Sequence, residues 1–130
     1  MSATPKQSTN TVVWFEIPAA DFDRAVRFYE RIFDTVLRKD QFGAATIGVF
    51  PYEGSGVSGC ITLGDGYKPA STGTVVYLNC DGRLDAVLDR VEAAGGRIAL
   101  PKFELPRGIG FSAQIIDTEG NRIGLHASKD

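Results

Sequence analysis

Apolar and polar positions in the first half of the chain follow a pattern that predicts a strand, a helix and three more strands. Residues 11–17 are rich in β-branched and aromatic side chains, which predicts a strand that ends at Pro18. Asp21 is a suitable N-cap for residues 22–34, where apolar side chains recur every three or four positions and indicate an amphipathic helix. Three shorter strands, separated by glycine-containing turns, are expected at residues 35–39, 45–50 and 57–63.

The second half of the chain repeats this order. Residues 74–80 have a strand composition similar to that of the first strand. Residues 84–94 have helical apolar spacing and are followed by a pair of glycines, which is typical of a helix end. A loop is expected at residues 101–110, and three strands are expected at residues 97–100, 111–117 and 122–127.

The repeat predicts an α+β chain built from two βαβββ units, in about residues 11–64 and 74–128. Two units are too few for a solenoid, so we expect them to lie side by side, with their sheets forming one concave surface. Together they are predicted to form a single domain of residues 11–128. Residues 1–10 are polar and are expected to be a disordered tail.

Composition excludes several classes of partner. The 130 residues carry 14 Lys and Arg against 16 Asp and Glu, a net charge of −2, so no basic face is available for nucleic acid. No apolar run approaches the roughly 20 residues of a membrane span, and the polar N-terminus does not resemble a signal peptide. Cys60 and Cys80 are expected to be reduced thiols of a cytoplasmic protein. With a single histidine, His126, one chain cannot form a multi-histidine metal centre.

Three segments resemble the vicinal oxygen chelate superfamily, which includes glyoxalases, bleomycin-resistance proteins, fosfomycin-resistance enzymes and extradiol dioxygenases. Residues 17–29 are similar to the family's connection from first strand to first helix, residues 91–97 to the end of its second helix, and residues 117–123 to its last turn. The resemblance implies paired βαβββ modules that form an open, curled, mixed β-sheet barrel with helices outside. A ligand cavity is expected inside.

The resemblance also implies a divalent metal held by His, Glu or Gln side chains of several strands. The family's ligand positions fall on Trp14, on or near Val75 and on Gly124 of this sequence, and none of these side chains binds a cation. The usual metal site is therefore expected to be lost, and no cofactor is expected. A divalent metal bound by Glu16 and His126, with a third ligand from Cys60 or a dimer partner, remains open.

Strand alternation predicts which side chains face the cavity. In the first strand Val13, Phe15 and Ile17 are expected to pack on the helices, which leaves Trp14 and Glu16 facing the cavity.

By the same alternation Val75, Tyr77 and Asn79 are expected to face inward, as are Arg122, Gly124 and His126. Glu16 and His126 then become candidates for a catalytic proton-transfer pair next to a substrate carbonyl. The alternatives are that the two groups only satisfy each other or that His126 lies in solvent.

Five further side chains are candidate ligand contacts. Trp14 and Tyr77 are expected on opposite walls, where they either stack a planar ligand or simply fill the barrel. Asn79 is expected to anchor a polar group, and Arg107 lies in a glycine-rich loop that can close over the cavity. Cys60 is either a ligand contact or a small buried hydrophobe.

Two hypotheses for function follow. The first is a glyoxalase-like small-molecule-binding protein, acting as a lyase or isomerase on a carbonyl or vicinal-oxygen substrate. The alternative is a non-catalytic binder that sequesters a planar small molecule, as bleomycin-resistance proteins do, so the sequence leaves open whether the protein is an enzyme. A homodimer is expected in both cases, because exposed sheet edges favour pairing.

Overall fold

The computed structural model describes residues 10–129, which form two four-stranded sheets and two α-helices. The first sheet has the order β1-β4-β3-β2. Its elements, with the helix that follows β1, are β1 (Trp14–Pro18), α1 (Phe22–Phe33), β2 (Arg38–Phe42), β3 (Ala45–Val49) and β4 (Ser58–Leu63). β1 is parallel to β4, and the other pairs are antiparallel.

The second sheet repeats this topology with the order β5-β8-β7-β6. Its elements are β5 (Tyr77–Asn79), α2 (Leu84–Val91), β6 (Arg97–Leu105), β7 (Gly110–Ile116) and β8 (Arg122–Ala127), with a short 3-10 turn at Pro106–Gly108. Again the inner strand β5 is parallel to its neighbour β8. The predicted pair of βαβββ modules and the α+β class are confirmed.

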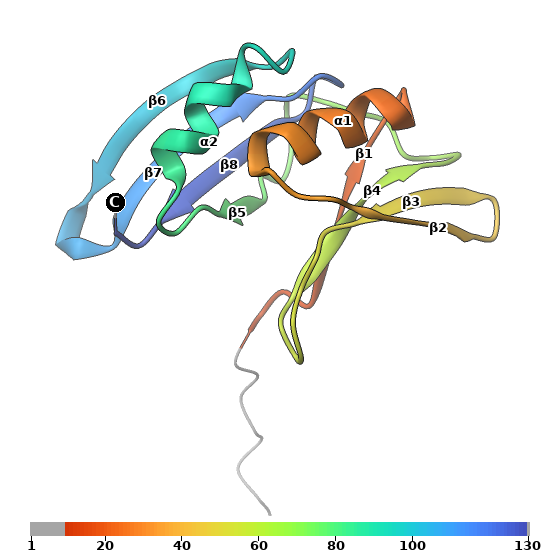
Figure 1. The fold of residues 1–130 in the computed structure, drawn as a ribbon, viewed down its shortest axis with the longest axis horizontal. Coiled ribbons are helices and arrows are strands. Elements are labelled where there is room, and N and C mark those ends of the chain that lie inside the picture. The colour runs from red at the N-terminus through yellow and green to blue at the C-terminus, as the bar shows by residue number, and fades with distance from the viewer. Residues whose placement is uncertain (1–9, 130) are drawn as a thin grey trace, which may run out of the picture.

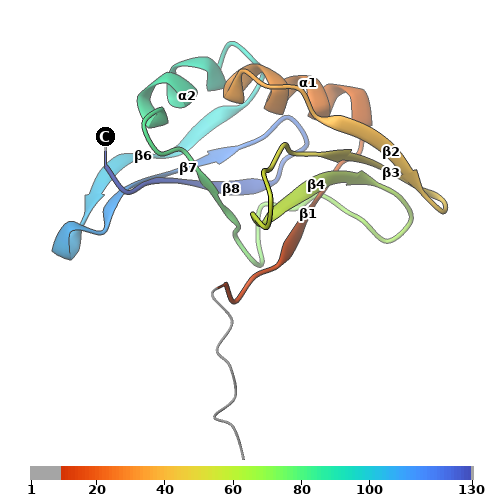
Figure 2. The same ribbon diagram turned by 60° about the horizontal axis from the view of Figure 1, so that its bottom comes forward.

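The two sheets form an open arch rather than a closed barrel. Figure 1 shows α1 and α2 on the same side of both sheets, with β2 and β6 at opposite ends of the molecule. Turned by 60°, the sheets curve away beneath the helices (Figure 2). Strands pair only within each sheet, so the two sheets are joined by side-chain contacts.

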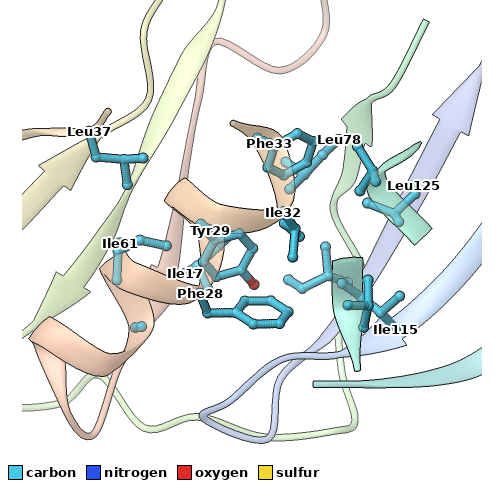
Figure 3. Packing of buried hydrophobic residues seen from close by; sticks show 14 of the residues in the cluster. Ile17, Phe28, Tyr29, Ile32, Phe33, Leu37, Ile61, Leu78, Ile115 and Leu125 are labelled. Atoms are coloured by element: carbon cyan, nitrogen blue, oxygen red, sulfur yellow. The ribbon is translucent and has the colours of Figure 1, made fainter. Parts of the chain in front are cut away.

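The hydrophobic core lies between the helices and the sheets. Phe28, Tyr29 and Ile32 of α1 are at most 1% exposed and pack against buried residues from both sheets. Figure 3 shows these side chains between Ile61 of β4 and Ile115 of β7. One helix therefore fills the core of both modules, which fixes the sheets relative to each other.

Helix α1 begins and ends as the sequence predicts. The Asp21 side chain accepts a hydrogen bond from the Arg24 backbone N–H at 3.1 Å, as an N-cap does. Asp34 has a φ of 51° and ends the helix in the left-handed conformation. The helix places its apolar residues on the core face and leaves Asp23 and Arg27 exposed.

Two of the segments that carry the family resemblance contact each other across the modules. The Tyr29 hydroxyl, buried on α1, donates a 2.6 Å hydrogen bond to Asp117 Oδ2 at the end of β7. Asn121 Nδ2 donates to the Pro18 carbonyl oxygen at 2.8 Å. The β7–β8 turn thus joins the β1–α1 connection.

Glu119 completes this junction. Its Oε1 accepts the backbone N–H groups of Ala20 at 2.9 Å and Asp21 at 2.8 Å, and its Oε2 accepts Arg24 Nε at 2.8 Å. Burial disfavours the carboxylate, but hydrogen bonds from Arg24, the Asp21 N–H, Thr118 and the Ala20 N–H outweigh it and lower the pKa of Glu119 to about 2. The junction therefore needs an ionised Glu119.

Several predicted boundaries are wrong. The strand expected at residues 35–39 is found at Arg38–Phe42, and β6 continues to Leu105 through residues expected to form a loop. Pro101 is tolerated there because β6 is an edge strand with register shifts on both sides of Leu100.

The inner strands are shorter than predicted and begin at Trp14 and Tyr77. Val13, expected to pack on the helices, is 74% exposed because it precedes β1. Of the predicted tail at residues 1–10, all but Asn10 lies outside the described residues. No helix within residues 10–129 has the length and apolar character needed to cross a membrane.

Candidate functional site

Strand alternation separates the core from the opposite face of both sheets. Ile17 of β1, Leu78 of β5 and Leu125 of β8 are buried on the helix side. Trp14 and Tyr77 keep 41% and 48% of their surface exposed on the other side. The even positions of β1 and β8 and the odd positions of β5 thus face away from the helices.

A cavity of about 960 Å³, which we call the seam cavity, runs between β1 and β5. Trp14 and Glu16 line it from the first sheet, and Tyr77, Asn79 and Arg122 line it from the second. The structure therefore brings four of the predicted site residues to one cavity, with one aromatic ring from each module. Lys68, in the loop that joins the modules, also lines it.

Tyr77 is held in place across the second sheet. The strand register pairs Tyr77 with Gly124 of β8 and Gly124 with Gln114 of β7. The Tyr77 ring lies over Gly124, where a Cβ atom would come within 2.3 Å of Cδ2. Its hydroxyl reaches Gln114, whose Nε2 is 2.8 Å away. The ring is thus fixed at both ends although it is half exposed.

The partners of Gln114 fix the direction of this hydrogen bond. Gln114 Oε1 accepts from Arg122 Nη1 at 3.0 Å, and a guanidinium can only donate. The amide nitrogen therefore donates to the Tyr77 oxygen, so the Tyr77 hydroxyl proton is available to a ligand. Arg122 is itself anchored through Nε to the Ser71 carbonyl oxygen at 3.2 Å.

Glu16 is bound by a residue that the sequence did not single out. The Tyr67 hydroxyl donates to its two carboxylate oxygens at 3.1 and 3.3 Å. This hydrogen bond to the Glu16 carboxylate raises the pKa of Tyr67. No sequence signal identified Tyr67, because a tyrosine in a loop at residues 64–73 can point in any direction.

A second cavity of about 580 Å³, which we call the sheet cavity, lies on the second sheet and contains His126. Asn79, His126 and Ser112 lie side by side there, because β5, β8 and β7 pair at these residues. His126 Nε2 is 3.0 Å from the Ile109 carbonyl oxygen. A carbonyl only accepts, so Nε2 carries the proton.

Glu16 and His126 line different cavities and have different hydrogen-bond partners. Their action as a proton-transfer pair stays a prediction, and the structure shows no contact between them among residues 10–129.

The two remaining candidates, Cys60 and Arg107, line neither cavity, although Cys60 of β4 pairs with the cavity residue Glu16 of β1. Cys60 is 1% exposed and packs with Ile47 and Val49, and its Sγ is 3.1 Å from Thr62 Oγ1. Burial raises the pKa of the Cys60 thiol, which favours its neutral form, and its role as a ligand contact stays a prediction. Arg107 lies in the β6–β7 turn with a φ of 61° and is exposed.

Comparison with known proteins identifies the family. The sequence profile of the glyoxalase/bleomycin resistance protein/dioxygenase superfamily matches residues 11–125. The chain belongs to this superfamily. No curated protein matches the chain by sequence.

Solved structures of the superfamily share the fold. A glyoxylase/bleomycin resistance protein/dioxygenase domain from Frankia sp. EAN1pec superposes with a TM-score of 0.68 at 21% identity, covering 92% of this chain and 98% of that one. The fosfomycin resistance protein FosX from Listeria monocytogenes has a TM-score of 0.62 at 18% identity, covering 94% of each chain. A glyoxalase I mutant from Zea mays has a TM-score of 0.62 at 20% identity, covering 88% of this chain. The chain matches only 45% of the length of the maize protein.

The divalent metal that the superfamily implies can be tested against the residues at its expected positions. These positions hold Trp14, Val75 and Gly124. None of the three has a side chain that can bind a metal ion. The Tyr77 ring also fills the space that a side chain at Gly124 would need. Within residues 10–129 no three His, Cys, Asp or Glu side chains group together as metal ligands would. These residues do not fit a divalent metal.

Proposed function

We propose that this superfamily member binds a planar aromatic small molecule in the seam cavity, without a metal, by contact with Trp14 and Tyr77. The observation that carries the proposal is the pair of half-exposed rings, one from each module, in a cavity of about 960 Å³. Aromatic rings in a concave site bind planar ligands through stacking and burial of apolar area.

The fixed position of Tyr77 supports binding rather than simple filling of the arch. Gly124 leaves room for the Tyr77 ring, and Gln114 donates a hydrogen bond to the Tyr77 hydroxyl. These two contacts hold the side chain in place although it is half exposed. A side chain that is already ordered loses little conformational entropy when a ligand binds. The free hydroxyl proton of Tyr77 adds a donor for a carbonyl or ring nitrogen of the ligand.

Lyase or isomerase chemistry on a carbonyl substrate has less support. That hypothesis needs Glu16 and His126 at one reacting carbon, whereas each lines its own cavity. General acid–base catalysis requires the base within hydrogen-bond reach of the proton that it removes. The binding hypothesis uses neither group as a base and depends only on the two rings.

Trp14 fluorescence gives a direct test, because Trp14 is the only tryptophan. We expect a panel of planar heteroaromatic compounds to include ligands that quench its emission saturably. Tyr77→Ala should weaken binding of such a ligand about tenfold, which corresponds to about 1.4 kcal/mol. The matched control is Tyr52→Ala, since Tyr52 is 52% exposed but lies outside the seam cavity. Equal affinity of the Tyr77→Ala variant and the native protein would refute stacking at this site.

Cytoplasmic location and homodimer formation belong to the same proposal. Cys60 and Cys80 are free buried thiols, which is usual in a reducing compartment. All five residues of the edge strand β2 are exposed, and such an edge favours pairing with a second chain. Light scattering of the purified protein should give twice the chain mass, and a monomer mass would refute the dimer.

A further inference from the structure

We propose that the ligand also carries a cationic amine, which binds Asp81 in the sheet cavity while its planar part occupies the seam cavity. This inference rests on the proposed function and names the class of compound that the site takes. The two cavities adjoin, because Tyr77, Leu78 and Asn79 line both of them. One molecule can therefore contact the aromatic seam and Asp81 together.

The sheet cavity has an apolar wall and a single acidic group. Its apolar lining residues include Leu78, Phe103 and Leu105. Apart from the titratable His126, Asp81 is the only side chain lining the cavity that carries a formal charge, and no lysine or arginine lines it. This composition favours a ligand that is mostly apolar and carries one positive charge.

Asp81 is held in position before any ligand arrives. Its Oδ1 accepts hydrogen bonds from the backbone N–H and the hydroxyl of Ser128, the latter at 3.1 Å. Asn79 Oδ1 in turn accepts the Asp81 backbone N–H at 2.8 Å. The bonds from Ser128 lower the pKa of Asp81, so the carboxylate is ionised at neutral pH.

The second carboxylate oxygen of Asp81 is left for a ligand. Asp81 Oδ2 accepts no hydrogen bond from residues 10–129 in the structure, and Asp81 forms no ion pair there. Interactions with His126 and Lys129 also lower the pKa of Asp81 and favour its ionised form. An ammonium group would find the Oδ2 acceptor in a cavity that Tyr77 and Phe103 also line, and carboxylates and aromatic rings both bind cations.

Three naphthalene probes of similar shape test the charge of the ligand. These are 2-(1-naphthyl)ethylamine, 2-(1-naphthyl)ethanol and 1-naphthylacetate, and calorimetric titration gives their affinities for the native protein. We expect the amine to bind at least tenfold more tightly than the alcohol and the acetate to bind more weakly than either. Asp81→Asn keeps the oxygen that Ser128 needs and removes the charge, so the amine should then bind only as well as the alcohol.

The matched control is Asp89→Asn, because Asp89 is exposed on α2 outside both cavities. This variant changes the net charge by the same amount and should bind all three probes as the native protein does. Equal binding of amine and alcohol to the native protein overturns this inference and leaves the proposed function in place. Failure of all three probes to bind overturns the proposed function and this inference with it. The comparison of probes on the native protein needs no variant to fold.

Discussion

Both sheets contain an aromatic residue that lies over a glycine of the neighbouring parallel strand, but the two pairs face opposite ways. In the first sheet Phe15 of β1 pairs with Gly59 of β4, and in the second Tyr77 of β5 pairs with Gly124 of β8. A Cβ atom would come within 2.4 Å of Phe15 at Gly59 and within 2.3 Å of Tyr77 at Gly124. Both residues line the seam cavity, but Phe15 is partly buried against the core, whereas Tyr77 is half exposed.

The same local arrangement therefore packs mainly against the core in one module and is half exposed in the candidate site in the other. The faces opposite the helices differ in the same way. On the first sheet Ile47, Val49 and Cys60 are buried there, while the second sheet keeps Asn79 and His126 accessible. The second module supplies most of the polar chemistry, and the first adds Trp14 and Glu16 at its edge.

Gly59→Ala should give the largest effect and test the structural half of this comparison. The new methyl group would meet the Phe15 ring and also the Phe15 carbonyl oxygen, both at 2.4 Å. Because a backbone atom is involved, β1 and β4 must move apart, and we expect a loss of about 3 kcal/mol in the free energy of unfolding. Urea denaturation measures this loss.

Gly43→Ala is the control for the change of residue type alone. Gly43 has a φ of +59° but no atom within 4 Å of its Cβ position. The substitution should therefore lower the free energy of unfolding only through backbone strain, by about 1 kcal/mol. If both variants lost the same stability, close contact at Gly59 would not be the cause.

The sequence predicts the fold well because the fold depends on short-range patterns. The period of apolar residues in α1, the Asp21 cap and the repeated order of elements are all visible without coordinates. The edge strands were harder to predict from the sequence. β2 is exposed at all five positions, so no alternation marks it, and β6 passes through Pro101 where a proline usually signals a loop.

The site was predictable only as far as strand alternation reaches. Alternation correctly places Trp14 and Tyr77 on the cavity face, since each strand fixes its own side chains. It says nothing about the distance between two sheets that share no hydrogen bonds, so it gives no guide to whether Glu16 meets His126. Tyr67 and Asp81 lie in loops, where side-chain direction has no period.

Acid should weaken the junction that joins the two sheets. Glu119 of the second module has a pKa lowered to about 2 by its contacts with the β1–α1 connection, against an ordinary value of 4.5. A depressed pKa adds stability above about pH 4.5, and that stability is lost as the pH falls toward about 2. Arg24 is half exposed, so after allowance for solvent screening we expect a contribution of about 1–2 kcal/mol.

Glu119→Gln gives the corresponding measurement. At neutral pH the variant should lose about 1–2 kcal/mol of unfolding free energy, and this difference should shrink as the native Glu119 is protonated near pH 2. Glu92→Gln is the control, since Glu92 is an exposed residue at the end of α2. A difference from the native protein that stays constant from pH 7 to pH 2 would rule out the ionised junction.

Gly124→Ala should have the smallest effect on stability but a clear effect on ligand binding. The variant therefore distinguishes the role of Tyr77 in the candidate site from the packing role of Phe15. The three atoms nearest to the new methyl group all belong to the half-exposed Tyr77 ring, which can rotate toward solvent. We expect a loss below about 1 kcal/mol in unfolding free energy. Because the displaced ring leaves Gln114 and the wall of the seam cavity, affinity for a planar ligand should fall at least fivefold.

Titration of Trp14 fluorescence measures this change, with Gly43→Ala expected to bind as the native protein does. A Gly124→Ala variant that binds normally would show that the position of the Tyr77 ring over the glycine serves the fold alone.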